Sequence, residues 1–133
     1  MTDDLKAVAA QCLAAAHDGS LDFPHIVQKL TAAGFESYAI DFRRRTATYY
    51  VPEGDSVELA LEGDVIPVAP SFATDAIKAA IREAQAGGAG YTYAGFCEKV
   101  KAAGCAGYIV SFSGRRALYF GRTAETHVEH FPN

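Results

Sequence analysis

The sequence lacks the features that mark several large classes of protein. No apolar run approaches the ~18 residues that a membrane helix requires, and there is no heptad array or long structureless tract. Basic residues are not in excess: the net charge is -4, and the sequence pI of about 5.5 argues against a dedicated nucleic-acid-binding protein. Cysteine is scarce, since the chain has three, an odd number without metal-ligand spacing.

The first residues, Met1-Thr2-Asp3-Asp4, are acidic where a secretory signal would be basic and apolar. With the scarce cysteine, this predicts a cytoplasmic protein with no membrane partner. The chain has 133 residues, half of them hydrophobic, which is enough to bury a substantial core. We therefore expect one domain over residues 1–133.

The strongest signal in the sequence is an internal repeat. Shifting the chain by 70 residues aligns Phe23 to Val51 with Tyr93 to Gly121 without a gap, and nine of these 29 pairs are identical. The identical pairs include Gly34 with Gly104, Tyr38 with Tyr108 and Arg45 with Arg115. This period is longer than the roughly 20 to 50 residues of solenoid and propeller repeats. It predicts a duplicated domain, with repeat 1 over about 3–64, a linker over 65–70 and repeat 2 over about 71–133.

Each repeat is predicted to begin with two helices. Apolar residues at helical spacing run from Leu5 to Ala16 in the first repeat and from Ile77 to Ala84 in the second. Thr74 or Ser71 is the candidate N-cap of the latter helix. The second helix of each repeat is expected to begin at Asp22 or Thr92, whose side chains can accept hydrogen bonds from the first turn, and to stop at Gly34 or Gly104.

Three strands are predicted to follow the helices in each repeat. Alternation places Tyr38, Ile40 and Phe42 on one face of the first hairpin and the corresponding residues 108, 110 and 112 on one face of the second. Ser113-Gly114 suits a two-residue hairpin turn, whereas Arg43-Arg44 suits it less well and predicts a longer loop. Third strands are expected from Val57 to Leu61 and from about Thr126 to Phe131. The fold class is α+β: two ααβββ units related by a pseudo-two-fold axis, with an antiparallel sheet and helices packed on one side.

A resemblance supports this organisation. The segment Leu21 to Leu30, continuing through Ala33-Gly34-Phe35 to Tyr38, and its counterpart from Tyr91 to Cys97 resemble the YbcV-like bacterial family of unknown function. The resemblance runs from about Leu5 to Pro132. Members of that family include prophage-encoded proteins, sometimes labelled phage envelope proteins. The resemblance therefore implies a phage-related origin, and it implies no activity, cofactor or catalytic residue.

The cysteines and histidines do not indicate a reactive or metal-binding site. Cys97 corresponds to Val27 on a predicted buried stripe and Cys12 lies on an apolar helix face, so inert core thiols are favoured over a nucleophile. In His127-Val128-Glu129-His130, alternation puts His130 on the face opposite to His127 and Glu129. Because zinc prefers three or four convergent ligands, we expect a solvated strand and no metal or other cofactor.

The arginines suggest an anion site. Six of the seven lie in the hairpin regions, and no basic residue occurs between Arg45 and Lys78. Guanidinium groups bind phosphate and carboxylate in a bidentate manner, so Arg45 and Arg115, with Tyr38 and Tyr108, are the anion-binding candidates. The alternative, which we favour, is that these arginines pair with neighbouring strands or are solvated at turns.

The second face of the sheet becomes apolar in the second repeat. Ile109, Leu118 and Phe120 replace Ala39, Thr48 and Tyr50, and an exposed apolar patch of this kind commonly marks an interface. The alternative is that the third strand or a terminus covers these residues. The patch leads us to expect a homodimer.

No catalytic residue is predicted. The sequence has no glycine-rich phosphate loop after a strand, no nucleophile-elbow pattern and no histidine–carboxylate pair beside a nucleophile. The leading hypothesis is a binding or interaction module that self-associates. The alternative is a small-molecule or anion-binding protein, with or without enzymatic activity, whose site lies between the two repeats. A cleft lined by Tyr38, Arg45, Tyr108 and Arg115 would favour the alternative, and a filled core with an exposed Ile109 surface would favour the first.

Overall fold

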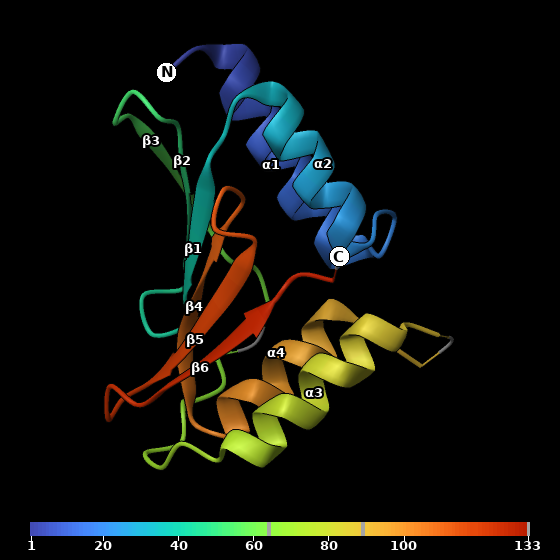
Figure 1. The fold of residues 1–133 in the computed structure, drawn as a ribbon, viewed down its shortest axis with the longest axis vertical. Coiled ribbons are helices and arrows are strands. Elements are labelled where there is room, and N and C mark those ends of the chain that lie inside the picture. Colours follow the sequence, from blue (N-terminus) through green and yellow to red (C-terminus); the bar gives the residue numbers. More distant parts are fainter. Residues whose placement is uncertain (64, 89, 133) are drawn as a thin grey trace.

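A computed structural model describes residues 1–63, 65–88 and 90–132 as an α+β fold with four helices and one six-stranded antiparallel sheet (Figure 1). Two helices and then three strands follow one another twice along the chain. The elements are α1 (Asp3–Asp18), α2 (Phe23–Ala33), β1 (Ser37–Asp41), β2 (Thr46–Tyr50), β3 (Ser56–Ala60), α3 (Thr74–Ala86), α4 (Tyr93–Ala102), β4 (Cys105–Ser111), β5 (Arg116–Gly121) and β6 (Thr126–His130).

Most helix ends follow the predicted caps; the two exceptions are the C-cap of α4, which is Ala103 where Gly104 was predicted, and the N-cap of α3. The Asp22 side chain accepts a hydrogen bond from the His25 amide of α2 at 3.0 Å, and Thr92 does the same for Gly95 of α4. Gly34 ends α2 with φ of 108°. The predicted cap of α3 is wrong: Ala73 occupies that position, and no side-chain hydrogen bond caps the helix. The Ala73 amide instead donates to the Ala103 carbonyl at 2.7 Å, so tertiary contact positions this helix.

The strand order is β3-β2-β1-β4-β5-β6, so all six strands form one sheet with β1 and β4 at its centre. These two strands run antiparallel, with Ser37 opposite Ser111 and Asp41 opposite Gly107. Hairpins connect β1 to β2, β2 to β3, β4 to β5 and β5 to β6. All four helices lie on one side of this sheet, α1 with α2 and α3 with α4 (Figure 1).

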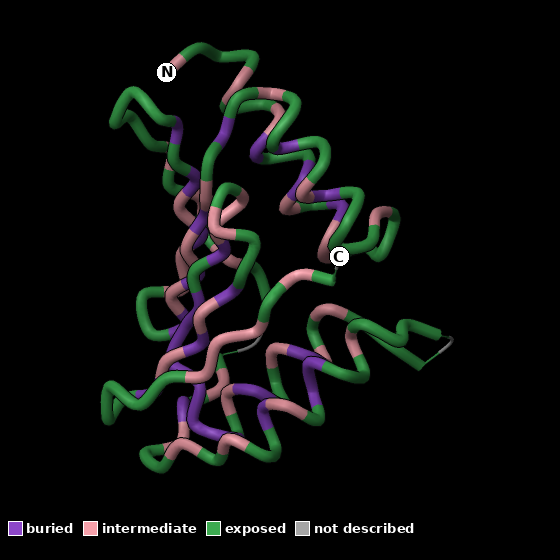
Figure 2. Tube along the Cα trace, viewed as in Figure 1, coloured by how far each residue is buried: buried purple, intermediate pink, exposed green. Residues whose placement is uncertain are grey.

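The core lies between the sheet and the helices (Figure 2). Buried and half-buried residues alternate along β1 and β2, which confirms the predicted inward face. Leu30 of α2 and Val100 of α4 are fully buried against it. The sheet contributes these buried side chains in corresponding pairs: Tyr38 and Tyr108, Ile40 and Val110, Ala47 and Ala117, Tyr49 and Tyr119.

The two central hairpins have loops of equal length. Residues 42–45 join β1 to β2, and residues 112–115 join β4 to β5, so the predicted two-residue turn at Ser113-Gly114 is wrong. A side chain stabilises each loop from the strand before it. Asp41 accepts hydrogen bonds from the amides of Arg43 and Arg44, and the Ser111 hydroxyl accepts one from Gly114. Each loop closes with an arginine at positive φ, 59° at Arg45 and 50° at Arg115.

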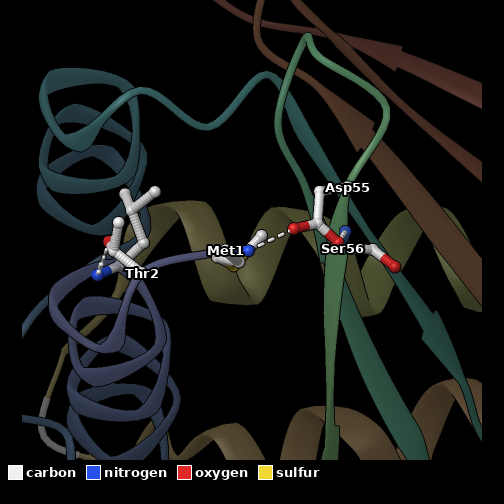
Figure 3. Close-up of polar contacts among 5 residues, drawn as sticks. Met1, Thr2, Asp55 and Ser56 are labelled. Atoms are coloured by element: carbon white, nitrogen blue, oxygen red, sulfur yellow. Dashed lines mark hydrogen bonds and ion pairs between the residues drawn. The ribbon is translucent and has the colours of Figure 1, made fainter.

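The start of α1 is tied to the turn between β2 and β3 (Figure 3). The amino group of Met1 forms an ion pair with the carboxylate of Asp55, and Thr2 caps the helix by accepting from the Leu5 amide at 3.2 Å. The hydrogen bond from the amino group is the main cause that lowers the pKa of Asp55. This contact holds the first helix against an edge hairpin of the sheet.

Candidate functional site

Tyr38 and Tyr108 lie in the core. Their ring centroids are 6.4 Å apart and both side chains are buried beneath the helices. The Tyr108 hydroxyl is hydrogen-bonded to the Tyr93 hydroxyl at 2.8 Å. Burial raises the pKa of both Tyr38 and Tyr108 well above the ordinary value, so both phenols are neutral at physiological pH. They therefore form part of a filled interior between the two pairs of helices.

Arg45 and Arg115 lie at opposite ends of the central strands. Because β1 and β4 are antiparallel, the loop after Asp41 is beside the start of β4, and the loop after Ser111 is beside the start of β1. Each guanidinium donates to a backbone carbonyl: Arg45 to Gly63 at 2.7 Å, and Arg115 to Pro132 at 2.9 Å. The structure therefore does not bring the two arginines together, and each one ties a following segment to its own hairpin.

Other cations gather around Arg45. A cavity of about 390 Å³ opens between the β1–β2 loop, the segment 65–68, the end of α4 and the residue after β5. We call it the cationic cleft. Its lining has four basic residues, Arg43, Arg45, Lys101 and Arg122, and an apolar part formed by Phe42, Val65, Ile66, Pro67 and Val68.

Sequence reasoning named only Arg45 among these four cations as an anion-binding candidate, and it missed Arg43, Lys101 and Arg122. Lys101 and Arg122 are separated from Arg43 by more than fifty residues, and no local pattern connects them. The available signal was the repeat itself: the residues 70 positions before Lys101 and Arg122 are Thr31 and Pro52, which carry no charge. Where only one of two corresponding positions carries a charge, the fold that the two halves share does not require that charge.

A smaller cavity of about 30 Å³ adjoins the cleft and shares Phe42, Arg45 and Lys101 with it. His17, in the last turn of α1, lines this cavity and packs edge-on against Tyr93 with ring centroids 5.4 Å apart. Its Nε2 atom is buried and has no hydrogen-bond partner among the described residues. Glu62 also lines the small cavity.

The predicted interface residues lie on the sheet face away from the helices, which we call the open face (Figure 1). Ile109 is 44% exposed, and Leu118, directly opposite it on β5, is half-buried. Phe120 is half-buried because its ring lies over Gly107: a Cβ on that glycine would be 2.7 Å from the ring. Since β6 extends the same sheet, the third strand does not cover these residues.

The three cysteines lie in apolar surroundings. Cys12 and Cys105 are buried and Cys97 is half-buried. Burial raises the pKa of the Cys97 and Cys105 thiols to about 11, and it raises that of Cys12 as well. The thiolate, which is the reactive form, is therefore scarce at neutral pH.

We expect a thiol reagent such as Ellman's reagent to label the native protein at least about tenfold more slowly than the urea-denatured protein at the same pH. A Cys97→Ser variant separates the half-buried thiol from the two buried ones. A native thiol that reacts as fast as in urea would contradict the assignment of all three as core residues.

His127 and Glu129 share one face of β6 as predicted, with Nε2 of His127 3.0 Å from the Glu129 carboxylate. Among residues 1–63, 65–88 and 90–132, no group of three or more metal-ligating side chains is arranged to hold an ion. Within the same ranges, no helix is both long and apolar enough to span a bilayer.

The fold and the two surfaces define a small α+β protein whose single sheet is covered by helices on one side only. Residues 11–129 match the family described as "Protein of unknown function (DUF1398)", and because the match covers most of the chain, the protein belongs to that family. A search of the curated proteins found no match.

Proposed function

We propose that this protein is an interaction module that self-associates as a homodimer through the open face of its sheet. The observation that supports this proposal is an apolar row across four strands of that face. Cross-strand pairing aligns Ala39, Ile109, Leu118 and Val128 in this row, and none of the four helices lies over it. Exposed apolar patches on otherwise polar surfaces commonly mark sites of protein association.

The charges beside the row favour a second copy of the chain as the partner. Glu58 of β3 and Asp41 of β1 lie on the open face of the first three strands. Arg116 of β5 and His130 of β6 lie on the open face of the last three. Two carboxylates therefore lie on one half of the face, which we call the acidic half, and a guanidinium and an imidazole lie on the other, which we call the basic half. Arg44 lies 3.9 Å from Glu58, but both side chains are exposed, and such pairs contribute little.

A two-fold axis parallel to the strands, passing between β1 and β4, would place the basic half of one copy over the acidic half of the other. It would also place Ile109 over Ala39 of the partner. Sheets that pack face to face lie roughly 10 Å apart with their strands within about 30° of each other. A two-fold contact uses the same patch on both copies, which this bipolar face permits.

Replacing Ile109 with lysine tests the dimer. Ile109 is the most exposed residue of the row, so Ile109→Lys should preserve the fold while placing two like charges near the axis. We expect the wild type to sediment as a dimer at about 100 μM. The dimer dissociation constant of the variant should be at least about tenfold higher.

Phe23→Lys is the matched control, because Phe23 is 43% exposed but lies on α2, away from the open face. It should leave the mass unchanged. A wild type that remains monomeric at about 1 mM would refute the dimer, as would an Ile109→Lys variant with unchanged association.

We further propose that the two halves arose by duplication and are related by a pseudo-two-fold axis between β1 and β4. Corresponding hydrogen bonds support this view. The amides of Leu61 and Phe131 donate to the carbonyls of Arg45 and Arg115, both at 2.8 Å. On the YbcV-like resemblance, we extend the proposal to a phage-derived protein that acts in the cytoplasm.

A further inference from the structure

We infer that the cationic cleft binds a phosphorylated small molecule that carries an aromatic or apolar group. The cleft is distinct from the open face, because none of its four cations lies in a strand of the sheet. It can therefore act whether or not the protein forms a dimer.

Two of the four cations have donor groups that no described residue engages. The side chains of Arg43 and Lys101 make no hydrogen bond to residues 1–63, 65–88 or 90–132. Lys101 lies over the Phe42 ring, with its Nζ 5.4 Å from the ring centroid, which keeps the ammonium at the cleft. None of the four cations forms an ion pair within the described part of the chain. Like charges held around one cavity repel each other, and an anion would relieve this repulsion.

The other two cations hold the wall of the cleft. Arg45 donates to the Gly63 carbonyl at 2.7 Å, and Arg122 donates to the Val68 carbonyl at 3.2 Å. These bonds hold Gly63 and Val68 at the cleft. Each guanidinium has five N–H donors in a planar fork, so one bond to a carbonyl leaves further donors for a ligand.

The corresponding positions of the other half, at the opposite end of the sheet, show which of the four charges the fold does not require. Seventy positions away from Arg43, Lys101 and Arg122, the chain has Ser113, Thr31 and Pro52. Only Arg45 has a charged counterpart, Arg115, which makes the same kind of bond to a backbone carbonyl. The common fold therefore needs one arginine at this position, and three additional cations gather at one end only.

The shape and lining of the cleft define the ligand class. Its volume of about 390 Å³ lies within the ~300–1,000 Å³ usual for small-molecule sites. Phosphate accepts several charge-assisted hydrogen bonds at once, which suits a ring of guanidinium and ammonium groups. The apolar side, from Phe42 to Val68, would remain uncovered by a bare inorganic ion. A phosphate joined to a ring or an aliphatic group fits both parts.

Titration calorimetry with three probes tests this inference: AMP, inorganic phosphate and adenosine. We expect AMP to bind, inorganic phosphate to compete with it, and adenosine to bind at least about tenfold more weakly than AMP. The variants Arg43→Ser and Lys101→Thr introduce the residues found 70 positions away. Each should weaken AMP binding at least about tenfold while the melting temperature stays close to that of the wild type.

Arg82→Ser is the matched control, because Arg82 is an exposed arginine of α3 outside the cleft. It should change the affinity for AMP less than about twofold. The inference is overturned if neither AMP nor phosphate binds at about 10 mM, if adenosine binds as tightly as AMP, or if Arg82→Ser weakens binding as much as Lys101→Thr. None of these results bears on the open face, so failure here and failure of the dimer can be told apart.

Discussion

Raising the pH from about 9 to about 12 is expected to unfold this protein in one cooperative step. The cause is its buried tyrosines. Burial raises the pKa values of Tyr38, Tyr93 and Tyr108 well above the ordinary value of 10.0, and Tyr49 and Tyr119 are raised for the same main reason. In the unfolded chain these phenols ionise near pH 10, whereas in the folded chain they keep their protons.

The folded state therefore binds more protons than the unfolded state above pH ~10, and its stability falls as the pH rises. Below that pH both states are protonated and the stability is fully present. Each such tyrosine contributes about 1.4 kcal/mol per pH unit in this window, so five together lose roughly 7 kcal/mol per unit. A typical domain is stable by about 5–15 kcal/mol, so unfolding should be complete within one or two pH units.

Tyrosinate absorbance and far-ultraviolet circular dichroism, recorded on the same samples, measure this transition. The larger part of the absorbance change should coincide with the loss of helix signal. Tyr50→Phe is the control, because this tyrosine is 40% exposed on the open face and its removal should leave the midpoint unchanged. If all tyrosines ionise near pH 10 while the circular dichroism remains native, the buried cluster does not control alkaline stability.

Replacing Gly104 with alanine is expected to destabilise the fold by more than about 3 kcal/mol, or to prevent folding. Two costs add at this position. The residue has φ of 95°, in the left-handed region that L-residues avoid at a cost of roughly 1–2 kcal/mol. A Cβ here would also lie 1.9 Å from the Ser71 carbonyl oxygen and 2.9 Å from Cα of Phe72, and backbone cannot move aside easily.

Gly34→Ala provides the matched comparison, because Gly34 occupies the corresponding position of the first half. Its φ is 108°, but a Cβ there would meet nothing within 4 Å. We expect a loss of only about 1–2 kcal/mol for this variant, measured by urea unfolding. Equal losses in the two variants would show that the contact between residue 104 and the segment 71–72 does not contribute to stability.

Much of the fold could be predicted from the sequence because its signals are local. Alternation identified the buried face of β1 and β2, since successive side chains point to opposite sides of a strand. The caps at Asp22 and Thr92 were predictable because a cap needs only a side-chain oxygen next to the first turn. The predicted bounds of the third strands lie within one residue of the observed bounds of β3 and β6.

The errors arose at the start of α3, where a distant segment determines the local structure, and in the loop after β4, where a contact within the loop does. The N-terminus of α3 is positioned by a hydrogen bond from Ala73 to Ala103, which no nearby residue indicates. The loop after β4 was predicted to be two residues shorter than it is. It has the length of the first loop because Ser111 accepts from Gly114, as Asp41 does for its own loop.

The sequence by itself determined the elements and their inward faces, since these depend on periodicity and on capping within a few residues. It also pointed to Ile109, Leu118 and Phe120 as neighbours on one face. Only the tertiary structure decided that β1 pairs with β4, that this pairing places Arg45 and Arg115 at opposite ends, and that Lys101 and Arg122 join Arg43 around one cleft. The physical reason is that strand pairing between the halves, and the positions of Gly63 and Val68 beside Arg45 and Arg122, depend on contacts between segments far apart in the chain. Periodicity carries no information about those contacts.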